Sequence, residues 1–179
     1  MRIISGTHKG IIINAPKGLP VRPTTDRAKE SLFNILENNF DFEGLACLDL
    51  FSGTGNVAYE FCSRGAQNVI SVDLDFGCVK FIKETIAKHQ FTQLTVFKKD
   101  AFTFINQCTE QFDLIFADAP YALDKLPTIP AQVFEKQLLK PKGWLIVEHQ
   151  SNLDLSNQSH FFEKRNYGQS TFSFFKNTI

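Results

Sequence analysis

The chain has 179 residues, of which 43% are hydrophobic and 21% charged, and its formal net charge at pH 7 is zero. This length suits one domain with a sizeable core, and no apolar run approaches the ~18 residues that cross a bilayer. The composition therefore argues against a membrane-spanning protein and against a uniformly basic coat for nucleic acid. Four cysteines without a CxxC pair and a start without a signal-peptide core predict a cytoplasmic protein with reduced thiols. The four histidines have no metal-ligand spacing, so no metal site is expected.

The first part of the chain combines an arm, a loop and a helix. Residues 2–14 alternate loosely around a "GTHKG" turn and predict a short hairpin or extended arm, and the proline-rich residues 16–25 predict a loop. A helix follows, because apolar residues recur at helical spacing, and Thr25 or Asp26 is its expected N-cap. The apolar positions are Ala28, Leu32, Ile35, Leu36 and Phe40.

Positive charge gathers at this end of the chain. Residues 1–30 hold six basic and two acidic side chains, a net charge of +4. A basic arm on a neutral body fits contact with a polyanion on one face, although ordinary solvated surface charge produces the same pattern.

From residue 45 onward, short apolar runs alternate with helical patterns. Near-continuously apolar strands between helices predict a parallel sheet covered on both faces. We therefore predict an α/β, doubly wound, Rossmann-like domain of mostly parallel strands, with an antiparallel strand near one edge. It spans residues 1–179, with the arm and first helix in 1–44 and the α/β core in 45–179. The predicted strands are 45–51, 68–73, 94–100, 112–118, 143–149, 160–168 and 170–176, and the predicted helices are 56–65, 76–90, 101–108 and 129–139.

A glycine-rich loop, "DLFSGTGN", follows the first strand of this core. Gly53 and Gly55 let the backbone approach a ligand, and the helix behind them offers free amides to an anionic group. Asp73 ends the next strand, twenty residues beyond Gly53, the distance at which a carboxylate bonds ribose hydroxyls. The spacing also satisfies the fingerprint of a dinucleotide site.

Two carboxylates favour S-adenosylmethionine over a dinucleotide. Asp49 precedes the glycines by four residues and suits a ligand with a sulfonium and an ammonium, whereas it would repel a pyrophosphate. Asp100 closes the third strand, where it could accept from an adenine amine while Leu74 covers the ring.

The fourth strand runs into "DAPY", residues 118–121, beside the glycine loop. Methylation of an aromatic exocyclic amine needs acceptors on the amine protons, because they align the nitrogen lone pair with the methyl group. Asp118 supplies a carboxylate, the carbonyl of Ala119 a second acceptor, and Tyr121 a face on which a base stacks for roughly 1–3 kcal/mol. With Pro120 these residues resemble the Asp-Pro-Pro-Tyr grip of amine methyltransferases.

With "RPTTDRAKESLFNIL", "DLFSGTGN", "VDLD" and "DAPY" in this order, the chain resembles the RsmD-type 16S rRNA (guanine-N2)-methyltransferases nearly end to end. The resemblance implies transfer of a methyl group from S-adenosylmethionine to guanine N2 in small-subunit rRNA during ribosome assembly. The zero net charge and the short basic arm further predict that the substrate is an assembled or partly assembled ribonucleoprotein. The departure is Ala119, which stands where the family has proline.

The resemblance also implies roles for further residues. Phe51, Asn56 and Ala101 join the cofactor site formed by Asp49, Gly53, Gly55, Asp73, Leu74 and Asp100. The residues implied for RNA contact or closure of the site are Lys9, Arg22, Thr24, Thr25 and Arg27.

Three other functions remain open on the sequence. A DNA adenine-N6 methyltransferase would use the same grip, although 179 residues show no evident target-recognition domain. A catalytically idle RNA-binding assembly factor would have lost turnover through Ala119. A nicotinamide-dependent dehydrogenase is disfavoured by Asp49.

Overall fold

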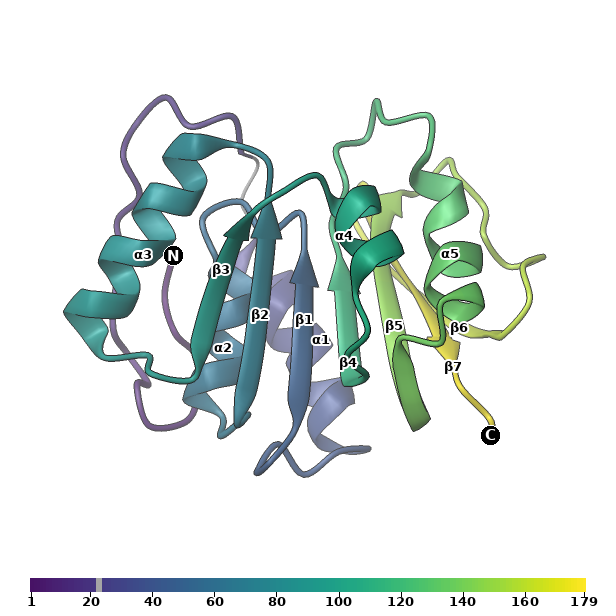
Figure 1. Ribbon diagram of the computed structural model, residues 1–179, viewed down its shortest axis with the longest axis horizontal. Coiled ribbons are helices and arrows are strands. Elements are labelled where there is room, and N and C mark those ends of the chain that lie inside the picture. Colours follow the sequence, from purple (N-terminus) through teal and green to yellow (C-terminus); the bar gives the residue numbers. More distant parts are fainter. Residues whose placement is uncertain (22–23) are drawn as a thin grey trace.

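The computed structural model describes residues 1–21 and 24–179 and contains one seven-stranded sheet (Figure 1). The strand order is β3-β2-β1-β4-β5-β7-β6; β1 to β5 are parallel, and β7 pairs antiparallel with both β5 and β6. This confirms the predicted doubly wound, Rossmann-like sheet of mostly parallel strands with an antiparallel strand near one edge. The strands are β1 Ala46–Leu50, β2 Asn68–Asp73, β3 Leu94–Lys98, β4 Phe112–Ala117, β5 Leu139–Gln150, β6 Phe161–Tyr167 and β7 Ser170–Lys176. The helices are α1 Asp26–Glu37, α2 Asn56–Ser63, α3 Phe76–His89, α4 Ala101–Gln107, the 3-10 turn η1 Leu126–Thr128 and α5 Ile129–Glu135.

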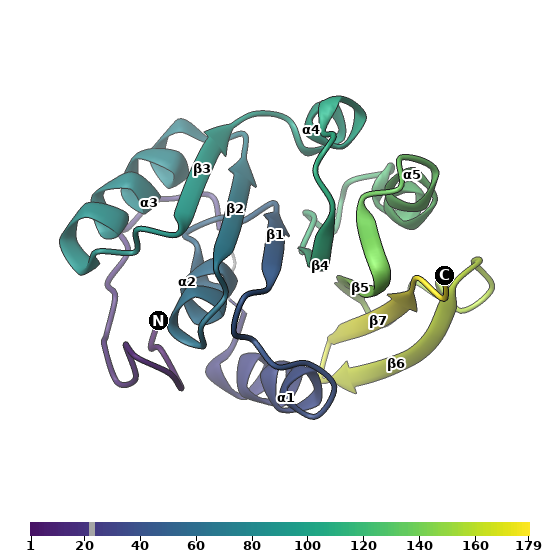
Figure 2. The ribbon, with the colours of Figure 1, turned by 60° about the horizontal axis from the view of Figure 1, so that its bottom comes forward.

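Helices cover both faces of the sheet (Figure 2). α1, α2 and α3 pack on one face through Phe33, Phe61 and Ile82, which are fully buried. α4 and α5 pack on the other face through Ile105 and Val133. Because both faces are covered, the central strands carry apolar side chains at nearly every position. Within the described ranges, none of the helices is both long and apolar enough to cross a membrane.

The largest shifts from the predicted boundaries lie between α5 and β5. The fifth helix ends at Glu135 rather than at residue 139, and β5 begins at Leu139 rather than at 143. The cause is Gln137, whose φ of 54° turns the chain into the left-handed region and ends the helix. Leu138 and Leu139, which continue the helical spacing in the sequence, therefore lead into the strand instead.

The N-terminal arm is extended and is joined to the core by buried charges. Arg2 and Ile12 form an antiparallel bridge, as a hairpin-like arm requires. Glu60 of α2 accepts hydrogen bonds from the amides of Ile4 and Ser5, both at 3.0 Å. Lys29 of α1 lies 3.3 Å from the same carboxylate, and both side chains are completely buried.

Arg64 and Asn56 complete this buried network. Arg64 Nε donates to Glu60 at 2.9 Å, and Lys29 Nζ donates to the Asn56 side chain at 2.8 Å and to the Arg2 carbonyl at 2.6 Å. The network therefore joins the arm and α1 to the residue that opens α2, at the end of the glycine loop.

Candidate active site

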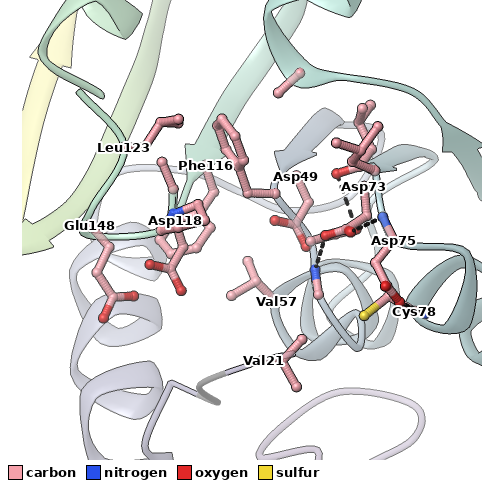
Figure 3. A pocket seen from close by; sticks show the side chains of 18 of the residues that line it. Val21, Asp49, Val57, Asp73, Asp75, Cys78, Phe116, Asp118, Leu123 and Glu148 are labelled. Atoms are coloured by element: carbon pink, nitrogen blue, oxygen red, sulfur yellow. Dashed lines mark hydrogen bonds between the residues drawn. The ribbon is translucent and has the colours of Figure 1, made fainter. Parts of the chain in front are cut away.

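A cavity of about 1290 Å³ lies at the carboxyl ends of the parallel strands. It opens where the strand order reverses, between β1 and β4, which is where ligands bind in doubly wound sheets. The volume exceeds the ~300–1,000 Å³ typical of a site for one small ligand, so the cavity has room for a cofactor and a base. Figure 3 shows Asp49 and Asp73 on one side of it and Asp118 and Glu148 on the other.

The glycine loop, residues 51–56, is held by Asp73. One oxygen of this carboxylate accepts from the Gly53 amide at 2.7 Å, and the other accepts from the Asp75 amide at 2.9 Å. Phe51 has a φ of 59°, a costly conformation for a bulky residue that is found mainly at functional sites.

Gly55 serves packing, and unlike Gly53 it is not among the residues that line the cavity. Its φ is 86°, and a Cβ there would lie 2.6 Å from the ring of Tyr59. This differs from the sequence interpretation, in which both glycines only admit a ligand; at Gly53 a Cβ would meet Val21 at 3.1 Å.

Asp49 is the most buried carboxylate of the cavity. It is 2% exposed, and burial raises its pKa well above the usual value, with Asp73 raising it further. Burial also raises the pKa of Asp73, against the opposing effect of the amide hydrogen bonds to Asp75 and Gly53. A cationic ligand group is therefore the natural partner of this part of the cavity.

Apolar side chains and Asp100 line the cavity on the side of β2, β3 and α4. Leu74 is 65% exposed and available to cover a ring, and Phe102 packs edge-on against Phe51 with ring centroids 6.0 Å apart. Asp100 lines the cavity and caps α4 through its bond to the Thr103 amide at 2.8 Å, and the buried Ala101 follows it.

All four residues of "DAPY" line the same cavity. The Asp118 amide donates to the Leu50 carbonyl at 3.3 Å, which ties the start of the segment to β1. Ala119 is 1% exposed, whereas Pro120 is exposed. The Tyr121 hydroxyl and the Ser170 hydroxyl are 2.7 Å apart, so a side chain of β7 fixes the half-exposed tyrosine.

The segment before α1 joins the two halves of the cavity. Thr24 donates to Glu148 at 3.3 Å, and its carbonyl accepts from Asn56 at 3.3 Å. Thr25 is the N-cap of α1, accepting from the Ala28 amide at 3.2 Å, and it also lines the cavity. Arg27 is exposed in the first turn of α1. Arg22, the remaining predicted residue of this segment, lies outside the described residues.

The structure separates Lys9 from the other predicted site residues. Lys9 is exposed, and its neighbours Thr7 and His8 bond to Ser63 at the carboxyl end of α2, whereas the cavity lies at the amino end of that helix. Among the described residues, the cations that line the cavity are Lys98, Lys99 and Lys125. Contact between Lys9 and RNA stays a prediction, at a distance from the cavity.

Sequence reasoning missed several residues that line the cavity, above all Glu148 at the end of β5, and also Phe102, Phe116, Tyr167 and Ser170. Glu148 is 4% exposed. Its signal was present in "GWLIVEH", a carboxylate at the carboxyl end of an apolar strand, which is the same rule that pointed to Asp49 and Asp118. Among the described residues, no group of three His, Cys, Asp or Glu side chains could hold a metal ion.

Comparisons with known proteins identify the family of the chain. Residues 1–176 match the model of the family described as Conserved hypothetical protein 95. YlbH of Bacillus subtilis, named as a candidate rRNA methyltransferase, is 36% identical over 159 residues, 87% of this chain and 85% of the relative. Ribosomal RNA small subunit methyltransferase D of Escherichia coli is 30% identical over 149 residues, 83% of this chain and 71% of the relative.

A solved structure shows the same architecture. The yhhF protein of Escherichia coli, described as a candidate methyltransferase, superimposes with a TM-score of 0.87 at 25% sequence identity, covering 99% of this chain and 97% of its own. The fold and the family predicted from the sequence are thereby confirmed. The chain belongs to the Conserved hypothetical protein 95 family, that of the RsmD-type methyltransferases.

Proposed function

We propose that this protein transfers a methyl group from S-adenosylmethionine to the N2 amine of a guanine in small-subunit ribosomal RNA. The observation that carries the proposal is that the "DAPY" segment and the buried Asp49 line one cavity. Asp49 lies in register with Phe116, and Asp118 follows two residues later, just beyond β4, so the backbone positions of Asp49 and Asp118 are offset by about 6.6 Å along the strands. Relatives that are named as rRNA methyltransferases support ribosomal RNA as the substrate. Because ribosomes assemble in the cytoplasm, we expect the protein to act there.

The residues present fit S-adenosylmethionine. Asp49 would face its cationic groups, Asp73 its ribose hydroxyls, and Asp100 with Leu74 its adenine ring. Phe51, Gly53, Asn56 and Ala101 line the cavity around it, and Gly55 allows the turn that leads into α2. When bound, the cofactor supplies an electrophilic methyl group on sulfur.

The "DAPY" segment would hold the nucleophile. The guanine N2 lone pair is delocalised into the base, and acceptors on the two N2 protons favour the geometry in which it is free to react. Asp118 supplies one acceptor and the Ala119 carbonyl the other. Tyr121, fixed by Ser170, offers the stacking face for a base that has left its helix, a step that costs a few kcal/mol.

RNA contact would spread beyond the cavity. Lys98, Lys99 and Lys125 lie where they can meet phosphates beside the target nucleotide, and Arg27 stands at the start of α1. With no net charge, the chain gains little from general attraction to RNA, so we expect a folded ribonucleoprotein to supply the specificity.

The proposal is tested by offering labelled S-adenosylmethionine with three substrates: small subunits lacking their own N2-guanine modification, naked 16S rRNA and duplex DNA. We expect transfer to the subunits, slower transfer to naked RNA and none to DNA. Comparable rates on naked and assembled RNA would contradict the ribonucleoprotein requirement. Transfer to adenine in DNA would overturn the proposal itself.

Cofactor binding is expected to strengthen as pH rises. In the free protein burial holds the pKa of Asp49 above its usual 3.8, so the folded state binds this proton more tightly than the unfolded chain. This contribution to stability is complete below 3.8 and is lost as pH rises through the raised value. A cationic ligand favours the ionised form, so binding releases a proton and affinity rises over the same range.

Calorimetry in buffers of different ionisation enthalpy measures that proton release. Asp49→Asn should lower the affinity and abolish the release, whereas Asp154→Asn, an exposed carboxylate outside the cavity, should change neither. Proton release that survives in Asp49→Asn would assign the raised pKa to another group.

Ala119→Pro is expected to change the transfer rate only slightly. The acceptor at this position is a main-chain carbonyl, which both residues have, and proline adds stiffness of roughly 0.4–1 kcal/mol. The rate should rise by no more than about fivefold, measured under single-turnover conditions. A rise of 100-fold would instead support the view that alanine made this protein an idle assembly factor.

A further inference from the structure

Two carboxylates stand side by side on the target side of the cavity. Ala117, the last residue of β4, lies in register with Val147 of β5, so the next residues, Asp118 just beyond β4 and Glu148 within β5, occupy matched positions along the two parallel segments. Matched residues point to the same face, and such strands are about 4.8 Å apart. Figure 3 shows both carboxylates directed into the same space.

Glu148 is held more firmly than a surface glutamate. It is 4% exposed, it accepts from the Thr24 hydroxyl at 3.3 Å, and its neighbour across the ladder is the fully buried Phe172. Thr24 itself lines the cavity and is tied to the glycine loop through Asn56. The side chain is therefore positioned at the cavity wall from two directions, by a strand and by the segment before α1.

The chemistry of such a pair matches one edge of one base. An ionised carboxylate only accepts hydrogen bonds. On guanine, the N1–H and N2–H₂ donors are adjacent on the Watson–Crick edge, whereas adenine has the acceptor N1 beside its N6 amine. Two neighbouring carboxylates thus suit guanine, and an oxygen facing adenine N1 repels it.

We propose that Glu148 accepts the N1–H of the target guanine while Asp118 accepts an N2 proton, so that Glu148 determines the choice of guanine over adenine. This rests on the proposed function and assigns the specificity of that same site. It also explains how an Asp-x-Pro-Tyr segment, which can hold adenine N6 or guanine N2, is restricted here to guanine N2. Glu148 acts in recognition of the base, and Asp118 at the reacting nitrogen.

A purely structural role for Glu148 predicts a different outcome. If the carboxylate only anchored Thr24, then Glu148→Gln, which keeps an acceptor oxygen of the same size, would leave the choice of base unchanged. In the proposed role the same variant alters that choice, because its amide can donate to an acceptor N1 as well as accept from N1–H.

The test uses small subunits reconstituted with guanosine or 2-aminopurine riboside at the methylated nucleotide, once that nucleotide is mapped. 2-Aminopurine keeps the reactive amine but presents N1 as an acceptor and lacks O6. The native protein should methylate guanosine about 10–100-fold faster than 2-aminopurine, since a good paired contact discriminates by that much. In Glu148→Gln the ratio should fall to within about threefold, and in Glu163→Gln, a carboxylate of β6 outside the cavity, it should stay native.

The outcomes separate the two proposals. A native protein that methylates both bases equally at N2 overturns the role of Glu148 and leaves the proposed function standing, and this comparison needs no variant. A ratio unchanged in folded Glu148→Gln also overturns it. No methylation of guanosine overturns both.

Discussion

Replacing Asp118 with alanine is expected to slow methyl transfer by about 10²–10³-fold and to leave the affinity for S-adenosylmethionine unchanged. The variant loses a hydrogen-bond acceptor positioned on the reacting amine. Removing one oxyanion-hole donor, a comparable change, raises the activation free energy by about 2.7–4 kcal/mol. The cofactor affinity should not change because Asp118 is not one of the residues predicted to bind the cofactor. It lines the same cavity as Asp49, but it lies two residues beyond Phe116, the residue paired with Asp49.

Single-turnover rates and calorimetry together check this prediction. Asp118→Asn should fall between the native protein and the alanine variant, because its amide oxygen still accepts one hydrogen bond. Asp154→Ala is the control, since this aspartate is exposed and outside the cavity. A rate within threefold of native in Asp118→Ala would show that the segment is an ordinary strand-to-loop junction.

Glu60→Gln is expected to lower the free energy of unfolding by about 3–5 kcal/mol, the cost of leaving a buried partner charge uncompensated. Glu60 is fully buried. Its carboxylate pairs with Lys29 and Arg64 and accepts hydrogen bonds from the amides of Ile4 and Ser5. Burial lowers the pKa of Lys29, and Glu60 is the main group that opposes this, so the variant lowers that pKa further.

Chemical denaturation measures this effect against a surface pair. Glu84→Gln removes an ion pair to Lys80 whose side chains are 63% and 64% exposed, and it should cost at most about 1 kcal/mol. In a double-mutant cycle with Lys29→Met, the double variant should lose less free energy of unfolding than the two single variants lose together. Neither buried charge is then left without its partner. Equal costs for Glu60→Gln and Glu84→Gln would contradict a structural role for the buried network.

Most of the fold and much of the cavity wall could be predicted because both depend on local patterns. Buried parallel strands are apolar at successive positions, so their ends are visible in the sequence, and strand ends share one edge of the sheet. That rule alone brings together Asp49, Asp73 and Asp118 from three strands. The boundary between α5 and β5 was wrong because apolar residues before β5 continue the helical spacing and only the left-handed Gln137 ends the helix.

The remainder depends on contacts distant in the sequence. Net charge marks the first thirty residues as basic but does not say which end of α2 the arm crosses, so Lys9 lies apart while lysines of other segments line the cavity. No short sequence motif predicts that the Tyr59 ring packs against Gly55 or that Lys29 pairs with Glu60. Glu148 obeys the strand-end rule, and its meaning appears only when its register with Asp118 is known.

The most direct measurement is the identity of the methylated nucleoside. Small subunits lacking their own N2-guanine modification are incubated with the protein and labelled S-adenosylmethionine, the RNA is digested, and the nucleosides are separated by chromatography. We predict label in N2-methylguanosine at a single nucleotide. Label in N6-methyladenosine, or no label while the cofactor still binds, would contradict guanine-N2 methylation.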